Sequence, residues 1–93
     1  MNLPVNKVLM HYFYILKCRD QSLYSGVAKD LEKREAVHNS GKGSKYVWAH
    51  GGGKIVYSEK FRTIGKALKR EAEVKKFSRQ EKLVLVKLAK QKK

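Results

Sequence analysis

The chain has 93 residues, of which 42% are hydrophobic, and its 22 lysines and arginines against 8 acidic residues give a formal net charge of +14. This length suits one domain with a single modest core, and the hydrophobic share excludes a disordered basic tail. A charge this high repels itself in a compact fold, so it indicates a polyanionic partner, with nucleic acid as the leading candidate. An anionic membrane surface is disfavoured because no long helix pairs an aromatic apolar face with a basic one.

Cys18 is the sole cysteine, so an internal disulfide is excluded, and the three histidines do not stand at the spacing of a zinc site. The first ten residues lack the pattern of an export signal, and no apolar run has the length of a membrane span. We therefore expect a cytoplasmic protein in which residues 1–10 are an N-terminal extension.

The first predicted element is a β-hairpin. Residues 11–18, HYFYILKC, are rich in aromatic and β-branched side chains and predict a buried strand. The polar RDQS at 19–22 predicts a turn, and LYSGV at 23–27 predicts the second strand.

The register of this hairpin decides where its tyrosines lie. If Cys18 stands opposite Ser22, then Tyr14 faces Gly26 and Tyr24 becomes its diagonal neighbour on the same side of the sheet. Such tyrosines can serve packing or chemistry, and the hairpin alone does not decide between the two.

A helix and a third strand follow. Asp30 has the chemistry of an N-cap for a helix that extends to about His38. The polar segment 39–45 predicts a loop, the short apolar YVWA that follows has no clear type, and KIVYSEKF at 54–61 predicts a strand.

The next helix, over residues 63–77, contains the most informative position. One face of this helix carries the apolar residues Ile64, Ala67, Leu68 and Val74. Glu71 lies at the centre of that face. A carboxylate buried without a partner is costly. Glu71 should therefore pair with a cation, bind a metal or line a cavity at the edge of the core.

Ser78 and Glu81 have the spacing of a capping box and predict that a last helix begins there, although its Leu-Val-Leu-Val run also suits a strand. We expect one domain over residues 11–88 and a frayed basic tail over 89–93. The order β-β-α-β-α-α defines an α+β fold, a three-stranded antiparallel sheet with flanking helices.

These residues resemble a GIY-YIG endonuclease domain, most closely the small stand-alone bacterial members. The resemblance covers residues 11 to 84 in the family's order and rests on FYI at 13–15, YSG at 24–26, DLEKR ending at Arg34, HNSGKGSKY from His38, and ALKREAEVKK containing Glu71. It implies metal-assisted hydrolysis of DNA phosphodiesters. By residue, it implies an active site of Tyr14, Tyr24, Arg34, His38 and Glu71.

The implied chemistry divides into tasks that these side chains suit. Glu71 would be the single protein anchor for Mg²⁺ or Mn²⁺, with water and phosphate completing the coordination. Arg34 would hold the scissile phosphate with its planar fork. We favour Tyr24 over Tyr14 as the general base and expect Tyr14 to orient water or phosphate. His38 would hydrogen-bond a tyrosine or the phosphate.

Four further residues are candidates for binding. Gly26 would allow a ligand to approach the backbone, and the DNA backbone would be contacted by Lys42, Lys45 and Tyr46, the last by stacking. For all of these positions the alternative is an ordinary structural or solvated residue.

The sequence also departs from the family pattern. The first motif reads Phe-Tyr-Ile where the family name implies Gly-Ile-Tyr. Glu35 and Ala36 stand where an apolar residue usually follows the arginine. The segment VWAHGGG stands where family members usually have an arginine-rich stretch that contains a proline. The late asparagine of larger members has no match. The leading hypothesis is a metal-dependent DNA nuclease, with a partner protein supplying specificity. The alternative is a non-catalytic domain that binds DNA or RNA.

Overall fold

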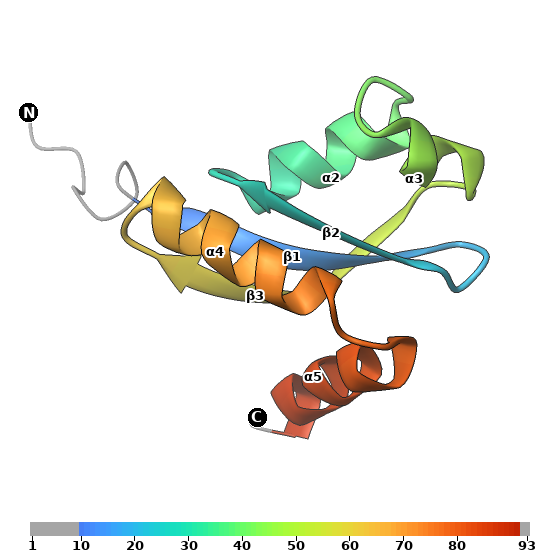
Figure 1. The fold of residues 1–93 in the computed structure, drawn as a ribbon. Coiled ribbons are helices and arrows are strands. Elements are labelled where there is room, and N and C mark those ends of the chain that lie inside the picture. Colours follow the sequence, from blue (N-terminus) through green and yellow to red (C-terminus); the bar gives the residue numbers. More distant parts are fainter. Residues whose placement is uncertain (1–9, 92–93) are drawn as a thin grey trace, which may run out of the picture.

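A computed structural model describes residues 10–91 (Figure 1). The elements in chain order are β1 (His11–Cys18), β2 (Leu23–Ala28), α2 (Leu31–Asn39), α3 (Lys45–Ala49), β3 (Gly53–Phe61), α4 (Ile64–Lys75) and α5 (Arg79–Gln91). The strands form one antiparallel sheet in the order β2-β1-β3, so β1 lies in the centre. The predicted α+β fold is confirmed, and the segment of unclear type is the short helix α3.

The hairpin has the register that brings its tyrosines together. The N–H of Cys18 donates to the carbonyl of Ser22, and Gln21 takes a positive φ of 79° in the turn. Tyr14 consequently pairs with Gly26, and Tyr24 pairs with Leu16. Both tyrosines therefore lie on the same face of the sheet.

The sheet is covered on both faces (Figure 1). On the first face, side chains of β1 pack with α2 and α3: Tyr14, Leu16, Cys18, Leu31 and Val47. On the second face, the alternate side chains of β1 pack with α4 and α5: Phe13, Ile15, Val74 and Val86. The two-residue period of β1 thus divides the domain into two apolar layers.

The predicted helix caps are present. Asp30 accepts from the N–H of Lys33 at the start of α2. At the start of α5, Ser78 and Glu81 form the reciprocal pair of a capping box, with distances of 2.8 and 3.2 Å. This cap makes the Leu-Val-Leu-Val run helical in spite of its β-branched residues.

The predicted apolar face of α4 is wrong at two positions. Ala67 and Val74 are buried, but Ile64 and Leu68 are 47% and 48% exposed. Arg70 sets the rotation of the helix instead, because its guanidinium faces β3 and binds the carboxylate of Glu59 at 3.0 and 3.1 Å.

The ends of the domain differ from the expected boundaries. The expected tail at 89–93 begins inside α5, which extends to Gln91, and Ala89 is half-buried in it. Residues 1–9 and 92–93, which include most of the expected N-terminal extension, lie outside the described residues. Within residues 10–91, every helix is too short or too polar to cross a membrane.

Candidate active site

Tyr14 lies at the centre of the candidate site and depends on a glycine. Its side chain is 1% exposed, on the central strand. A Cβ placed on Gly26 would lie 2.6 Å from the phenol oxygen and 2.7 Å from Cζ, closer than any real contact allows. Gly26 therefore permits a close approach of the backbone to the phenol of Tyr14.

His38, on α2, connects this helix to Tyr14 on β1. It is 1% exposed, and its Nε2 lies 2.8 Å from the phenol oxygen of Tyr14. The backbone N–H of Ser44 donates to its Nδ1 at 3.1 Å. Because a neutral imidazole carries one proton, that proton is on Nε2 and is donated to Tyr14. The hydroxyl proton of Tyr14 is then not used in the bond to His38.

The loop between α2 and α3 makes this arrangement possible. A Cβ on Gly43 would lie 2.5 Å from Nδ1 of His38, so a glycine is needed there. The hydroxyl of Ser44 caps α3 by accepting from the N–H groups of Tyr46 and Val47. Gly43 and Ser44 were not predicted as site residues, since the only signal for them in the sequence is their place in the loop that follows His38.

The environment keeps both groups neutral. Burial lowers the pKa of His38, and the nearby Arg34 guanidinium lowers it further. Burial raises the pKa of Tyr14 well above its usual range, with smaller contributions from Tyr24 and Glu71, whereas Arg34 acts in the opposite direction. Tyr14 is therefore a hydrogen-bond donor at neutral pH.

Arg34 and Glu71 are the charged members of the group. Both charges act on the pKa of Tyr14: the Arg34 guanidinium lowers it and the Glu71 carboxylate raises it. The Glu71 side chain is 20% exposed and pairs with Lys75 at 3.4 Å, so it does not lie in a dry core. Arg34 is exposed and lines a cavity of about 750 Å³ between α2 and the start of α4.

A row of aromatic rings continues from this cluster. The ring of Tyr24 lies 6.4 Å from that of Tyr14 and 5.3 Å from that of His38. Tyr46 of α3 stacks on Tyr24 with centroids 6.0 Å apart, and it lies 4.2 Å from the ring of His50. The structure therefore brings Tyr46 to the candidate site.

The two lysines expected to bind DNA are on the segment that leads from His38 to Tyr46. Lys42 is in the turn after α2 and Lys45 is the first residue of α3, and both are exposed. Neither forms an ion pair within residues 10–91.

The donor set suits a hard divalent cation held by few protein ligands. Within residues 10–91 no three His, Cys, Asp or Glu side chains cluster as a metal-binding group. Glu71 offers one carboxylate whose side chain is 20% exposed, and its ion pair is with the exposed Lys75. One carboxylate with water and phosphate oxygens is a coordination that Mg²⁺ accepts. The residues therefore fit a one-metal site with Glu71 as its anchor.

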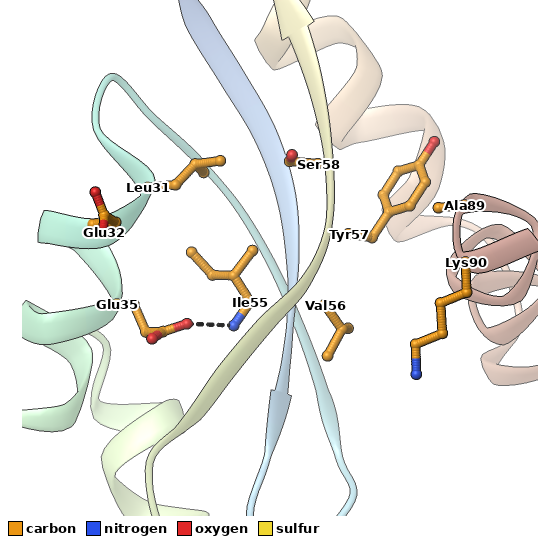
Figure 2. Close-up of a pocket in the computed structure, with 9 residues that line it drawn as sticks. All are labelled: Leu31, Glu32, Glu35, Ile55, Val56, Tyr57, Ser58, Ala89 and Lys90. Atoms are coloured by element: carbon orange, nitrogen blue, oxygen red, sulfur yellow. Dashed lines mark hydrogen bonds between the residues drawn. The ribbon is translucent and has the colours of Figure 1, made fainter. Parts of the chain in front are cut away.

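A second large cavity lies elsewhere, at the outer edge of β3. It has a volume of about 700 Å³ and lies between α2 and α5 (Figure 2). None of the predicted site residues lines it. Here Glu35 accepts from the backbone N–H of Ile55 at 2.7 Å. This bond gives a structural reason for an acidic residue directly after Arg34.

A three-stranded antiparallel sheet in the order β2-β1-β3 with helices on both faces, whose hairpin brings Tyr14 and Tyr24 together, defines a GIY-YIG-like fold. The GIY-YIG catalytic domain family matches residues 10–83, and the chain belongs to this family, which is one of nucleases.

The chain is similar to small proteins named UPF0213. It is 55% identical over 76 residues to the UPF0213 protein of Staphylococcus saprophyticus, covering 82% of this chain and 93% of that protein. It is 48% identical over 77 residues to the UPF0213 protein of Staphylococcus aureus, covering 83% and 94%. The solution structure of a UPF0213 protein from Bacillus halodurans is 42% identical, covers 85% of this chain and 84% of that one, and superposes with a TM-score of 0.54.

Proposed function

We propose that this protein is a divalent-metal-dependent endonuclease that hydrolyses phosphodiester bonds in DNA, in DNA repair or processing. The observation that carries the proposal is the buried Tyr14–His38 pair with the ring of Tyr24 beside it, and the opposite charges of Arg34 and Glu71 both act on the pKa of Tyr14. The net charge of +14 supports a polyanionic substrate.

Each residue has one task in this proposal. Arg34 binds the scissile phosphate and stabilises the charge that develops on its oxygens. Tyr14 keeps its proton and donates it as a hydrogen bond to a phosphate oxygen or the attacking water, while His38 holds the phenol in place. Tyr24, acting as the phenolate, would accept the proton of the attacking water, and the alkoxide that leaves the phosphorus would take a proton from solvent. Glu71 holds Mg²⁺ or Mn²⁺, which when bound polarises the phosphate and lowers the pKa of water.

The binding surface is small. Lys42 and Lys45 contact the DNA backbone, and Tyr46 extends the site by stacking. A domain of this size has little surface for reading bases, so a partner protein supplies specificity. Glu71 paired only to Lys75 would equally suit a domain that binds nucleic acid without cutting it, and this is the alternative that the experiment must exclude.

The test compares two glutamates on the same helix. Wild type, Glu71→Gln and Glu73→Gln are incubated with labelled DNA of several forms in Mg²⁺, Mn²⁺ or EDTA. Wild type and Glu73→Gln should cut in the presence of metal, and Glu71→Gln should be slower by roughly 10²–10³-fold. The proposal fails if wild type cuts no DNA form, or if Glu71→Gln cuts as fast as wild type.

A further inference from the structure

A small basic groove lies next to the candidate site, between α3 and the first turn of α5. Its volume is about 220 Å³, and its lining consists of Ser22, Leu23, Tyr46, Arg79 and Lys82. Both of its charged side chains are cationic. The larger cavities beside α2 differ, since they include carboxylates such as Asp30 and Glu35.

One side chain connects this groove to the proposed general base. Tyr46 lines the groove, and its ring also stacks on Tyr24 at an interplanar angle of 28°. A ligand in the groove therefore lies one side chain away from Tyr24. A nucleic-acid strand that passes the catalytic tyrosines in this direction meets Arg79 and Lys82 next.

The carboxylates nearest to the groove in sequence are already engaged. Glu81 accepts from the N–H of Ser78 within the capping box. Asp20 accepts from the N–H and the hydroxyl of Ser22 and pairs with His50. Within residues 10–91, neither carboxylate forms an ion pair with Arg79 or Lys82. Both cations are therefore available to an external anion.

We propose that this groove is a phosphate-binding subsite for the DNA strand that is cut, next to the scissile phosphate. Arg79, which is exposed, and Lys82, which is half-buried, bind the phosphate, and Tyr46 supports the adjoining nucleotide. Arginine offers a planar fork and lysine a point charge, and both release counterions from the strand on binding. This subsite rests on the proposed function, because it describes where the DNA substrate of the proposed active site continues.

The test replaces both cations and compares them with two lysines further along α5. The variants are Arg79→Gln/Lys82→Gln and, as the control with the same change of charge, Lys87→Gln/Lys90→Gln. Both pairs are made in wild type and in Glu71→Gln, and circular dichroism checks that they fold. Binding of a fluorescein-labelled single strand and of its duplex is measured by anisotropy in EDTA, over a range of KCl concentrations.

The variant Arg79→Gln/Lys82→Gln should bind DNA about tenfold or more weakly than its parent at low salt. The slope of log K against log [KCl] should decrease in magnitude by about 1.4–1.8, as expected for two lost phosphate contacts. The control pair should change both quantities by less than half as much. Equal changes in the two pairs would overturn the proposal. Cleavage separates it from the proposed function: if wild type does not cut but only Arg79→Gln/Lys82→Gln weakens binding, the groove is a phosphate contact of a domain that binds without cutting, and the nuclease proposal fails.

Discussion

Each face of the sheet holds a tyrosine among polar side chains, Tyr14 on the α2 face and Tyr57 on the α4 face, but the two groups differ in how many of their side-chain donors and acceptors have partners. On the α4 face, Tyr57 donates to Glu59, and the same carboxylate accepts from Nε and Nη2 of Arg70. On the α2 face, Tyr14 bonds to His38, whereas Arg34 makes no side-chain hydrogen bond or ion pair within residues 10–91.

The difference separates a structural network from a binding site. A polar network in which every member is satisfied fixes the position of its elements, in this case α4 on β3. A cation near a buried phenol but without a partner leaves its donors to a ligand. The two groups should therefore respond in opposite ways to mutation: one loses stability and the other loses cleavage.

The largest effect is expected at Arg34. Arg34→Ala should reduce the single-turnover cleavage rate by roughly 10²–10³-fold, because the developing charge on the phosphate loses its partner. The melting temperature should not change, since Arg34 supports no other described residue. Lys33→Ala, the exposed neighbour on α2, is the matched control. Equal rate losses in the two variants would show that Arg34 only attracts DNA through its charge and does not bind the scissile phosphate.

Gly26→Ala tests whether the position of the Tyr14 phenol requires the absence of a side chain at residue 26. The added Cβ would lie 2.6 Å from the phenol oxygen, so the ring must move away. The free energy of unfolding should fall by about 1–3 kcal/mol in urea titration, and cleavage should fall with it. At Gly65 a Cβ meets nothing within 4 Å, and Gly65→Ala should preserve both. Full cleavage by Gly26→Ala would show that the ring position does not matter.

On the other face, Glu59→Gln should reduce stability and leave the chemistry intact. Arg70 and Tyr57 lose a shared, half-buried partner, at a cost of about 1–3 kcal/mol in the free energy of unfolding. Cleavage measured well below the melting temperature should match wild type. Glu73→Gln removes only the more exposed ion pair of Arg70 and should cost less than about 1 kcal/mol. If Glu59→Gln cleaves more slowly than wild type at a temperature where it is fully folded, Glu59 takes part in catalysis and the two groups do not differ in function.

The smallest effect concerns pH. The pKa of His38 is lowered by burial and by Arg34, so the unfolded chain takes up a proton near pH ~6.5 while the folded chain does not. The contribution of His38 to stability is therefore complete above that pH and is lost as the pH falls towards the folded pKa, at up to ~1.4 kcal/mol per pH unit. Urea titrations between pH 7.5 and 5.5 should show a smaller decrease for His38→Gln than for wild type. Identical decreases would contradict the neutral, buried imidazole.

The sequence predicted those parts of the structure that depend on local spacing. Strand alternation and turn length determine the hairpin register, and the spacing of Ser78 and Glu81 determines a cap. The apolar face of α4 was wrong, because a distant residue, Glu59, draws Arg70 inward and turns Ile64 and Leu68 to the solvent. A wheel diagram counts apolar residues and cannot include an ion pair with another strand.

The surroundings of the site were also hidden from the sequence. Tyr14, Tyr24, Arg34 and His38 were singled out through motifs, Glu71 first through its place on the predicted apolar helix face and then through a motif, and the roles of all five remain predictions. The N–H of Ser44 that sets the tautomer of His38 is a backbone group, which every residue except proline carries. No residue pattern could therefore indicate it.

The most direct test removes one hydroxyl from each group, in Tyr14→Phe and in Tyr57→Phe. Single-turnover cleavage of the same DNA is measured with saturating metal at a temperature where both variants are folded. Tyr14→Phe should be slower than wild type by about 10²-fold, and Tyr57→Phe should remain within about threefold of it. If the two variants lose activity equally, or if Tyr14→Phe cuts as fast as wild type, the distinction between a structural and a catalytic face of this sheet is wrong.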